Sequence, residues 1–156
     1  MSEIIEKLAE WIHEEWRKGD YPKKPQLDVP YSELAPIDKD ANRAAGRRIA
    51  DVLALVGLGV STPEDTKSRE RAADSAIPPY IEAHVERLAE AEHEGWMAHR
   101  AKNGWVYGPT RDDDRKLHPL MVPYSQLPED EKEKDRKAVR NYPKQVEAAG
   151  LAIVWL

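Results

Sequence analysis

The sequence predicts an α+β protein that is mainly helical and is built from two related repeats. Apolar residues recur at helical spacing in several long segments, and short apolar runs follow Gly57 and Gly150, as expected for brief strands after helix ends. Residues of the first half also recur in the second half in the same order. The repeated residues are Leu8, His13, Trp16, Val29, Tyr31 and Leu34, which match Leu88, His93, Trp96, Val122, Tyr124 and Leu127.

The spacing of the repeat changes along the chain, and the change locates an insertion. The spacing is 80 residues from Leu8 to Trp16 and 93 residues from Val29 onward, so the second repeat has thirteen additional residues. These fall within Asn103–Pro119, a segment rich in glycine, aromatic rings and charge that we call the arm. A loop that interrupts only one of two matched repeats is typical of a functional element.

The first repeat, residues 1–60, contains two predicted helices and one strand. The first helix begins at Ser2, whose side chain can cap it, and ends at Gly19. A proline-rich extended stretch follows, because proline is excluded from helix interiors. The second helix is predicted over Asp38–Val56 with Gly57 as a left-handed end, and the strand over Leu58–Val60.

Residues 61–78 are predicted to be a mobile or loosely packed linker, because they lack an apolar period. Their hydroxyl groups, including those of Thr66 and Ser68, could accept phosphate, although a solvated connector is the favoured interpretation. The linker joins the first repeat to the second, residues 79–156, in one compact tandem.

The second repeat follows the same plan as the first. A helix is predicted over Pro79–Lys102, and an extended stretch over Leu120–Tyr124 follows the arm. The next helix begins at Pro128, and Pro143 is expected to kink or restart it because proline lacks the amide donor. The chain ends in a predicted buried strand, Leu151–Leu156.

Composition limits the function classes. Without cysteine, the chain has no disulfide, thiolate metal site or thiol nucleophile. A net charge of −5 argues against a nucleic acid polymer as partner. No apolar stretch is long enough for a membrane span and the amino terminus lacks a signal pattern, so we expect a cytoplasmic protein without a membrane partner.

The arm carries the most distinctive chemistry. Aromatic faces beside guanidinium, ammonium and imidazole groups suit a planar phosphorylated ligand, since rings stack on a base and cations bind phosphates. In an equally weighted alternative, the rings pack the arm onto its own domain while the charges pair in solvent. The candidate ligand-binding residues are Trp105, Tyr107, Arg111, Arg115, Lys116 and His118.

No cofactor, metal site or catalytic set is predicted. Asp112, Asp113 and Asp114 lack the alternating spacing of a calcium loop, which favours a solvated turn. His13 and His93 have no second histidine one helical turn away, which favours a hydrogen-bonding role in the core. No nucleophile motif or phosphate-binding glycine loop is present.

The segment from His93 to Leu127 resembles the ryanodine receptor repeat, or RyR domain. That family has a His-Glu-x-Trp helix, a Gly-Trp-x-Tyr-Gly element, an Arg-Asp-Asp stretch, a His-Pro pair and a Tyr-Ser-x-Leu-Pro helix entry. The corresponding residues here are His93-Glu94-Gly95-Trp96, Gly104-Trp105-Val106-Tyr107-Gly108, Arg111-Asp112-Asp113, His118-Pro119 and Tyr124-Ser125-Gln126-Leu127-Pro128.

The resemblance implies two RyR repeats packed with pseudo-twofold symmetry, each with two antiparallel helices and short strands. It also implies a non-catalytic module of bacterial or phage type that binds a nucleotide-derived signal, with Trp105, Tyr107, Arg111 and His118 facing the ligand. The first repeat lacks the arm and its tryptophan. A second stacking face would then come from another copy of the chain, in a homodimer, or from Trp11, Trp16 or Tyr21.

We therefore expect a non-enzymatic module that binds a nucleotide or nucleotide-derived second messenger, for sensing or sequestration in phage defence or counter-defence. One alternative is a protein-interaction or assembly module that docks through the aromatic arm. A weaker alternative is a nucleotide-degrading enzyme with His118 or His99 as acid or base.

Overall fold

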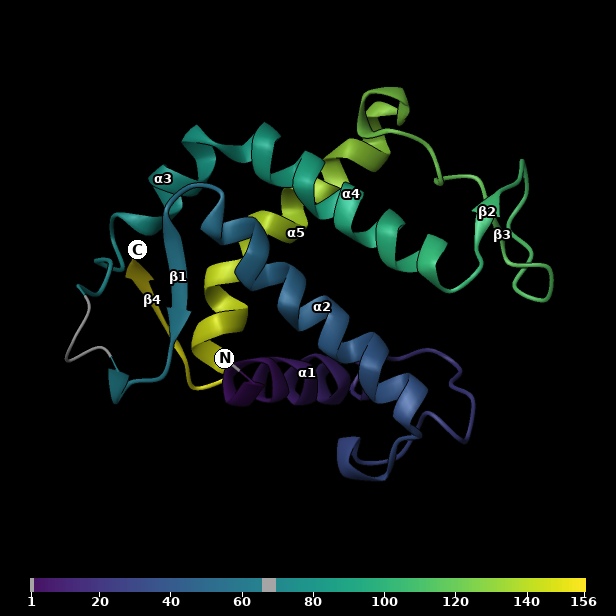
Figure 1. Ribbon diagram of the computed structural model, residues 1–156, viewed down its shortest axis with the longest axis horizontal. Helices are drawn as coiled ribbons and strands as arrows, with labels where there is room; N and C mark the ends of the chain where they lie inside the picture. The colour runs from purple at the N-terminus through teal and green to yellow at the C-terminus, as the bar shows by residue number, and fades with distance from the viewer. Residues whose placement is uncertain (1, 66–69) are drawn as a thin grey trace. The chain divides into compact units, whose positions relative to one another are not determined.

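The computed structural model describes residues 2–65 and 70–156 and confirms a mainly helical α+β protein (Figure 1). The chain forms two compact units. Unit 1 comprises Met1–Ile77 together with Tyr142–Leu156, and unit 2 comprises Pro78–Asn141. The C-terminal strand therefore belongs to the same unit as the first repeat, whereas the sequence assigned it to the second repeat.

Unit 1 is built on α1 (Ser2–Arg17) and α2 (Pro36–Ala54), which confirms both predicted helices. The short 3-10 helix η1 (Tyr31–Glu33) lies between them in sequence. The two helices approach closely at Gly46, where an added Cβ would lie 3.1 Å from the Leu8 Cβ. The core between them is apolar and contains Ile5, Leu8, Ile49 and Leu53.

Two glycines end helices in unit 1 and lead into its sheet. Gly57, with φ +81°, is the predicted left-handed end before β1 (Leu58–Ser61), and Gly150, with φ +78°, precedes β4 (Ala152–Trp155). The two strands lie side by side and run antiparallel (Figure 1), with Leu58 opposite Trp155. Both predicted strands are confirmed, and this pairing joins segments that are far apart in the sequence.

The prediction that residues 61–78 form a mobile or loosely packed linker is wrong for much of the described part of this segment. The Trp155 amide donates to the Glu70 carbonyl at 2.9 Å, and the Ala72 amide donates to the Ile153 carbonyl at 3.1 Å. Ala72 is 1% exposed, and Ser61 lies in β1. The residues around Ala72 thus pair with β4. No pattern in the neighbouring sequence predicts this pairing. The candidate phosphate acceptors Thr66 and Ser68 lie outside the described residues.

In unit 2 the predicted helix over Pro79–Lys102 is two helices, α3 (Ile77–Ala83) and α4 (Val85–Lys102). His84, at φ −119° and ψ 16°, leaves the helical conformation between them although the apolar period continues. The predicted extended stretch before Tyr124 forms no strand and leads into the 3-10 helix η3 (Tyr124–Gln126).

The last helix, α5 (Glu129–Ala148), begins where Pro128 predicted and runs from unit 2 into unit 1. Pro143 lies inside α5, so the helix does not restart there. Among the described residues, no helix has both the length and the apolar character required to cross a bilayer.

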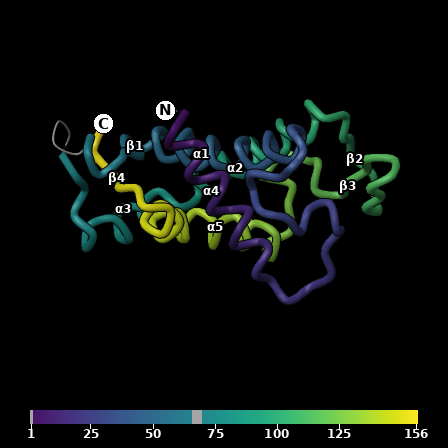
Figure 2. Tube along the Cα trace, turned by 90° about the horizontal axis from the view of Figure 1, so that it is seen from below, coloured from purple at the N-terminus to yellow at the C-terminus, as the bar shows by residue number. Residues whose placement is uncertain are grey.

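The arm follows the end of α4 and folds back on itself (Figure 2). Its strands β2 (Val106–Tyr107) and β3 (Leu117–His118) pair in parallel, with the Val106 amide 3.0 Å from the Lys116 carbonyl. A Cβ at Gly108 would lie 2.6 Å from the Leu117 Cβ, so the close approach of the strands requires glycine. The arm is thus more regular than its sequence suggests.

Candidate functional site

The same histidine contact occurs in both units. His13 Nε2 lies 2.7 Å from the Val29 carbonyl, and His93 Nε2 lies 2.7 Å from the Val122 carbonyl. Both rings are 3% exposed, and each stacks on the tryptophan three residues later with centroids 5.6 Å apart. The favoured interpretation of these histidines as core hydrogen-bonding groups is confirmed.

A tyrosine, a glutamate and an arginine form a second matched set. Tyr124 donates to Glu86 at 3.0 Å, and Arg136 pairs with the same carboxylate. The hydrogen bond from Arg136 lowers the pKa of Glu86, while burial and the contact with Glu86 raise the pKa of Tyr124 to about 12. The corresponding set in unit 1 is Tyr31, Glu6 and Arg43. These contacts form a framework that both units have, so the arm is what distinguishes unit 2.

The guanidinium of Arg100 contacts two tryptophan rings beside the arm. Its Cζ lies 4.5 Å from the Trp105 ring centroid and 5.4 Å from that of Trp96. The side chain is half-buried, and no described carboxylate lies within ion-pair distance of it. Desolvation, reinforced by the nearby charge of Arg111, lowers the pKa of Arg100.

Sequence reasoning missed Arg100. The available signal was its position four residues after Trp96 in a helix, which places both side chains on one face one turn before the arm. The contact between Arg100 and Trp105 depends on how the arm folds back, and helical spacing does not show this.

His118 lies on the inner side of the arm and is 8% exposed. Its Nδ1 accepts a hydrogen bond from the Leu120 amide at 3.1 Å, and its ring meets Trp96 edge-on with centroids 5.0 Å apart. Burial, followed by the charges of Arg111 and Arg100, lowers its pKa. The uncharged ring, whose Nδ1 is already hydrogen-bonded, therefore packs inside the arm. The resemblance had instead implied that His118 faces the ligand.

The two predicted stacking residues differ in accessibility. Trp105 is half-buried: its ring contacts Arg100 and His118, and the rest of the side chain is accessible to solvent. Tyr107 is 56% exposed, as is its neighbour Val106. The arm therefore packs partly on its own unit and also presents an exposed aromatic and apolar edge.

The three remaining predicted cations have partners within the arm. Arg111 pairs with Asp113 at 2.8 Å, Arg115 lies 3.8 Å from Asp112, and Lys116 donates to the Asn103 carbonyl at 2.9 Å. Asp112 Oδ1 also accepts the amides of the second and third residues after it, which confirms the turn role of the aspartate run. A ligand anion would have to compete with Asp112 and Asp113.

The predicted second stacking face forms a separate cluster in unit 1. Lys23 Nζ lies 4.5 Å from the Tyr21 centroid and 5.8 Å from that of Trp16. The Tyr21 hydroxyl donates to the Trp16 carbonyl at 2.8 Å. Trp11 is half-buried on the same helix and has no ring contact with a described residue.

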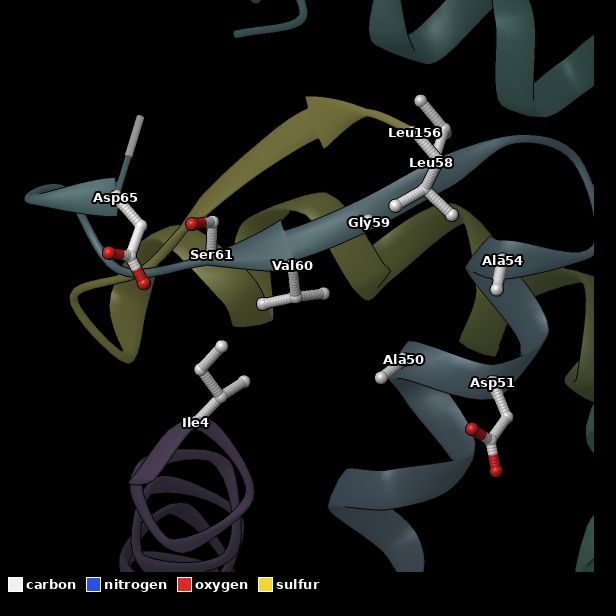
Figure 3. Close-up of a pocket in the computed structure, with 10 residues that line it drawn as sticks. All are labelled: Ile4, Ala50, Asp51, Ala54, Leu58, Gly59, Val60, Ser61, Asp65 and Leu156. Atoms are coloured by element: carbon white, nitrogen blue, oxygen red, sulfur yellow. The ribbon is translucent and has the colours of Figure 1, made fainter. Parts of the chain in front are cut away.

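Unit 1 also has a cavity of about 460 Å³ that sequence reasoning missed. Ile4, Ala50 and Val60 line it, together with Ser61, Asp51 and Asp65 (Figure 3). None of the residues predicted from the sequence as ligand-binding lines this cavity.

The fold and the arm together define a small, mainly helical α+β domain with an aromatic and cationic projection after its long helix. The RyR domain family matches residues 71–154, more than half of the chain, including α4 and the whole arm. The chain therefore belongs to the RyR domain family, and the resemblance in the segment from His93 to Leu127 is confirmed at the level of the family.

Proposed function

We propose that this RyR domain protein is a non-catalytic cytoplasmic module that binds a nucleotide or nucleotide-derived second messenger at the arm of unit 2. One observation carries the proposal: Arg100 is a half-buried guanidinium that contacts Trp96 and Trp105 and has no carboxylate of the described residues within ion-pair distance, although the charge of Asp113 acts on it from farther away. The biological role proposed for such binding is sensing or sequestration in phage defence or counter-defence.

The chemistry of Arg100 favours an anionic ligand. A guanidinium that has lost part of its hydration without a carboxylate in direct contact is a strong site for phosphate, which can accept two parallel hydrogen bonds from it. His118 is not expected to bind the phosphate. Burial lowers its pKa, so the ring is uncharged at neutral pH, and its Nδ1 already accepts a hydrogen bond. The accessible parts of Trp105 and Tyr107 would stack on the base.

The other cations take secondary roles in this proposal. Arg111 is close enough to Arg100 to lower its pKa, so a phosphate beside Arg100 would draw Arg111 away from Asp113. Arg115, whose side chain is 80% exposed, and Lys116 would contribute long-range attraction.

Calorimetric titration with mono-, di- and cyclic nucleotides tests the proposal. We expect Arg100→Gln to weaken binding by about 100-fold, the loss of one charge-assisted contact of about 2–3 kcal/mol. Arg115→Gln is the matched control and should change binding by less than about threefold. Equal binding by the Arg100→Gln variant, or no heat with any nucleotide, would contradict the proposal.

The non-catalytic part of the proposal has its own test. After prolonged incubation with the protein, each nucleotide should be recovered unchanged by chromatography. Turnover that disappears in His118→Gln or His99→Gln would instead support a nucleotide-degrading enzyme.

We also infer that the first part of unit 1 is a related repeat without an arm. Support comes from the shared contacts: the His13 and His93 bonds have the same length, as do the Tyr31 and Tyr124 bonds. Loss of the arm from one repeat would leave the structural framework intact.

The exposed edge of Val106 and Tyr107 favours a second candidate function, assembly through the arm into a homodimer. Sedimentation velocity distinguishes the two functions. If assembly is the function, Tyr107→Ser shifts a dimer to monomer, and no nucleotide binds to either form. A monomer at all concentrations removes this candidate.

A further inference from the structure

Unit 2 contains a groove of about 230 Å³, lined by residues that precede and follow the arm in sequence. Leu120 and Leu127 supply apolar lining, and Trp96 borders the groove. The buried ring of His93 and the carboxylate of Asp135 also line it. The groove thus combines an apolar surface with hydrogen-bond acceptor groups. The Asp135 carboxylate in it takes no part in the framework contacts described above.

Two acceptors face each other in this groove. His93 Nε2 lies 2.7 Å from the Val122 carbonyl, which can only accept a hydrogen bond, so the ring donates from Nε2 and, in that tautomer, Nδ1 presents a lone pair. Nδ1 lies 3.8 Å from Asp135 Oδ2, which is too long for a hydrogen bond. The His93 side chain is only 4% exposed, and its Nδ1 has no hydrogen bond to any described residue. A donor placed between Nδ1 and Oδ2 would bind to both atoms.

The first repeat provides an internal comparison, because the same groove positions can be found from the repeat spacing. Ile12 stands at the position of Glu92, Ala41 at that of Lys134, and Asn42 at that of Asp135. His13 keeps the 2.7 Å bond to its carbonyl, yet Asn42 donates to the Asp38 carbonyl at 3.1 Å. The carboxylates of Glu92 and Asp135 are therefore not needed for the framework.

We propose that this groove binds the lysine side chain of a partner polypeptide, with the ammonium between His93 Nδ1 and Asp135 Oδ2. Acceptors 3.8 Å apart can both lie about 2.8 Å from a single nitrogen. Leu120 and Leu127 would contact the aliphatic part of the side chain. Glu92 and Glu131 add negative charge at the groove, and Lys134 is already paired with Glu131 at 2.9 Å.

The size of the groove favours a side chain over a complete small molecule. Small-molecule sites usually enclose about 300–1,000 Å³, and this groove has about 230 Å³. One long side chain fills such a space while its backbone stays outside. This inference does not depend on nucleotide binding at the arm, since the arm site relies on Arg100 and this groove on His93 and Asp135.

Nuclear magnetic resonance titration of the full chain with the peptide acetyl-Gly-Lys-Gly-amide tests the inference. We expect saturable shifts of the His93 ring nitrogens and the Trp96 indole, and no shift of His13 or Trp16. The same peptide with an Nε-acetylated lysine should produce no shift, because it lacks the charge. Equal shifts with the acetylated peptide, or no shifts with either, would overturn the inference.

Two variants that take their new residues from the first repeat complete the test. Asp135→Asn should weaken peptide binding by about tenfold, and the fold should persist because the first repeat has asparagine there. Lys134→Ala, which also copies the first repeat, should retain binding. Unchanged binding by Asp135→Asn would refute the site. If n-butylammonium binds as tightly as the peptide, the groove takes a free amine and the polypeptide partner is rejected. Calorimetric nucleotide titration of Asp135→Asn separates this site from the arm.

Discussion

His118 shows how burial changes the role of a residue that looks ligand-facing in sequence. Its ring contacts both Trp96 and Trp105, and its Nδ1 accepts a hydrogen bond from the Leu120 amide. Burial and two nearby arginines lower its pKa from the ordinary value of 6.5. At neutral pH the ring is therefore an uncharged packing element of the arm.

The His118 environment predicts a pH dependence of stability. Because the folded protein binds this proton less readily than the unfolded chain, the contribution of His118 to the free energy of unfolding is fully present above pH 6.5. It is lost as the pH falls through the lower folded pKa. Urea unfolding between pH 7.5 and about 5 should show this loss, and His118→Gln should reduce it. An identical pH dependence in the variant would contradict the assignment.

The hydrogen bond of the Tyr124 hydroxyl should contribute measurably to the stability of the protein. Tyr124→Phe removes the 3.0 Å bond to Glu86 and should lower the free energy of unfolding by about 1 kcal/mol, since the carboxylate remains accessible to water. Tyr31→Phe is the matched control in unit 1 and should cost a similar amount. Denaturant unfolding measures both, and ultraviolet titration of the wild type should show Tyr124 ionising near pH 12.

Among the elements, the helix ends are set by glycine. Gly57 and Gly150 both adopt positive φ, and no atom lies within 4 Å of a Cβ added at either position. The requirement for glycine there comes from the backbone conformation alone. This explains why the sequence located these helix ends and the strands that follow them.

Replacement of Gly150 tests that explanation. Gly150→Ala should destabilise the protein by about 1 kcal/mol, because an L-residue is strained at φ +78°. Gly150→Asn should cost less, since asparagine tolerates the left-handed region. Thermal unfolding would rank the three proteins, and an alanine variant as stable as the wild type would disprove the backbone explanation.

At the scale of the whole molecule, β4 joins the end of the chain to its first half. It pairs with β1 and also exchanges hydrogen bonds with Glu70 and Ala72. Val154, at the centre of β4, is 1% exposed. Ala152, Ile153 and Val154 are therefore part of the core of unit 1.

We predict that Val154→Ala lowers the stability of unit 1 by about 2 kcal/mol through lost burial. The Ala72 amide donates to Ile153 in β4, and the Leu156 amide, just after β4, donates to Gly57 before β1. Both amides should then exchange faster together. Leu156→Ala, at a residue that is 64% exposed, should have a much smaller effect. Hydrogen exchange read by mass spectrometry or resonance assignments checks this, and unchanged Ala72 exchange would contradict it.

The amino-acid sequence by itself determined the features that depend on neighbouring residues. Helical periodicity located α1 and α2, glycine located the helix ends, and the repeat spacing located the arm. It also indicated that His13 and His93 belong to the core. Each of these follows from backbone preferences or from side chains a few positions apart.

The tertiary structure alone decided which distant groups meet. It paired β4 with β1, ordered the residues around Ala72, and broke the helix at His84. It also placed Arg100 against Trp105 and buried His118. These contacts join groups whose separation in sequence has no fixed relation to their distance in space, so only the folded chain determines the burial and charge that the site depends on.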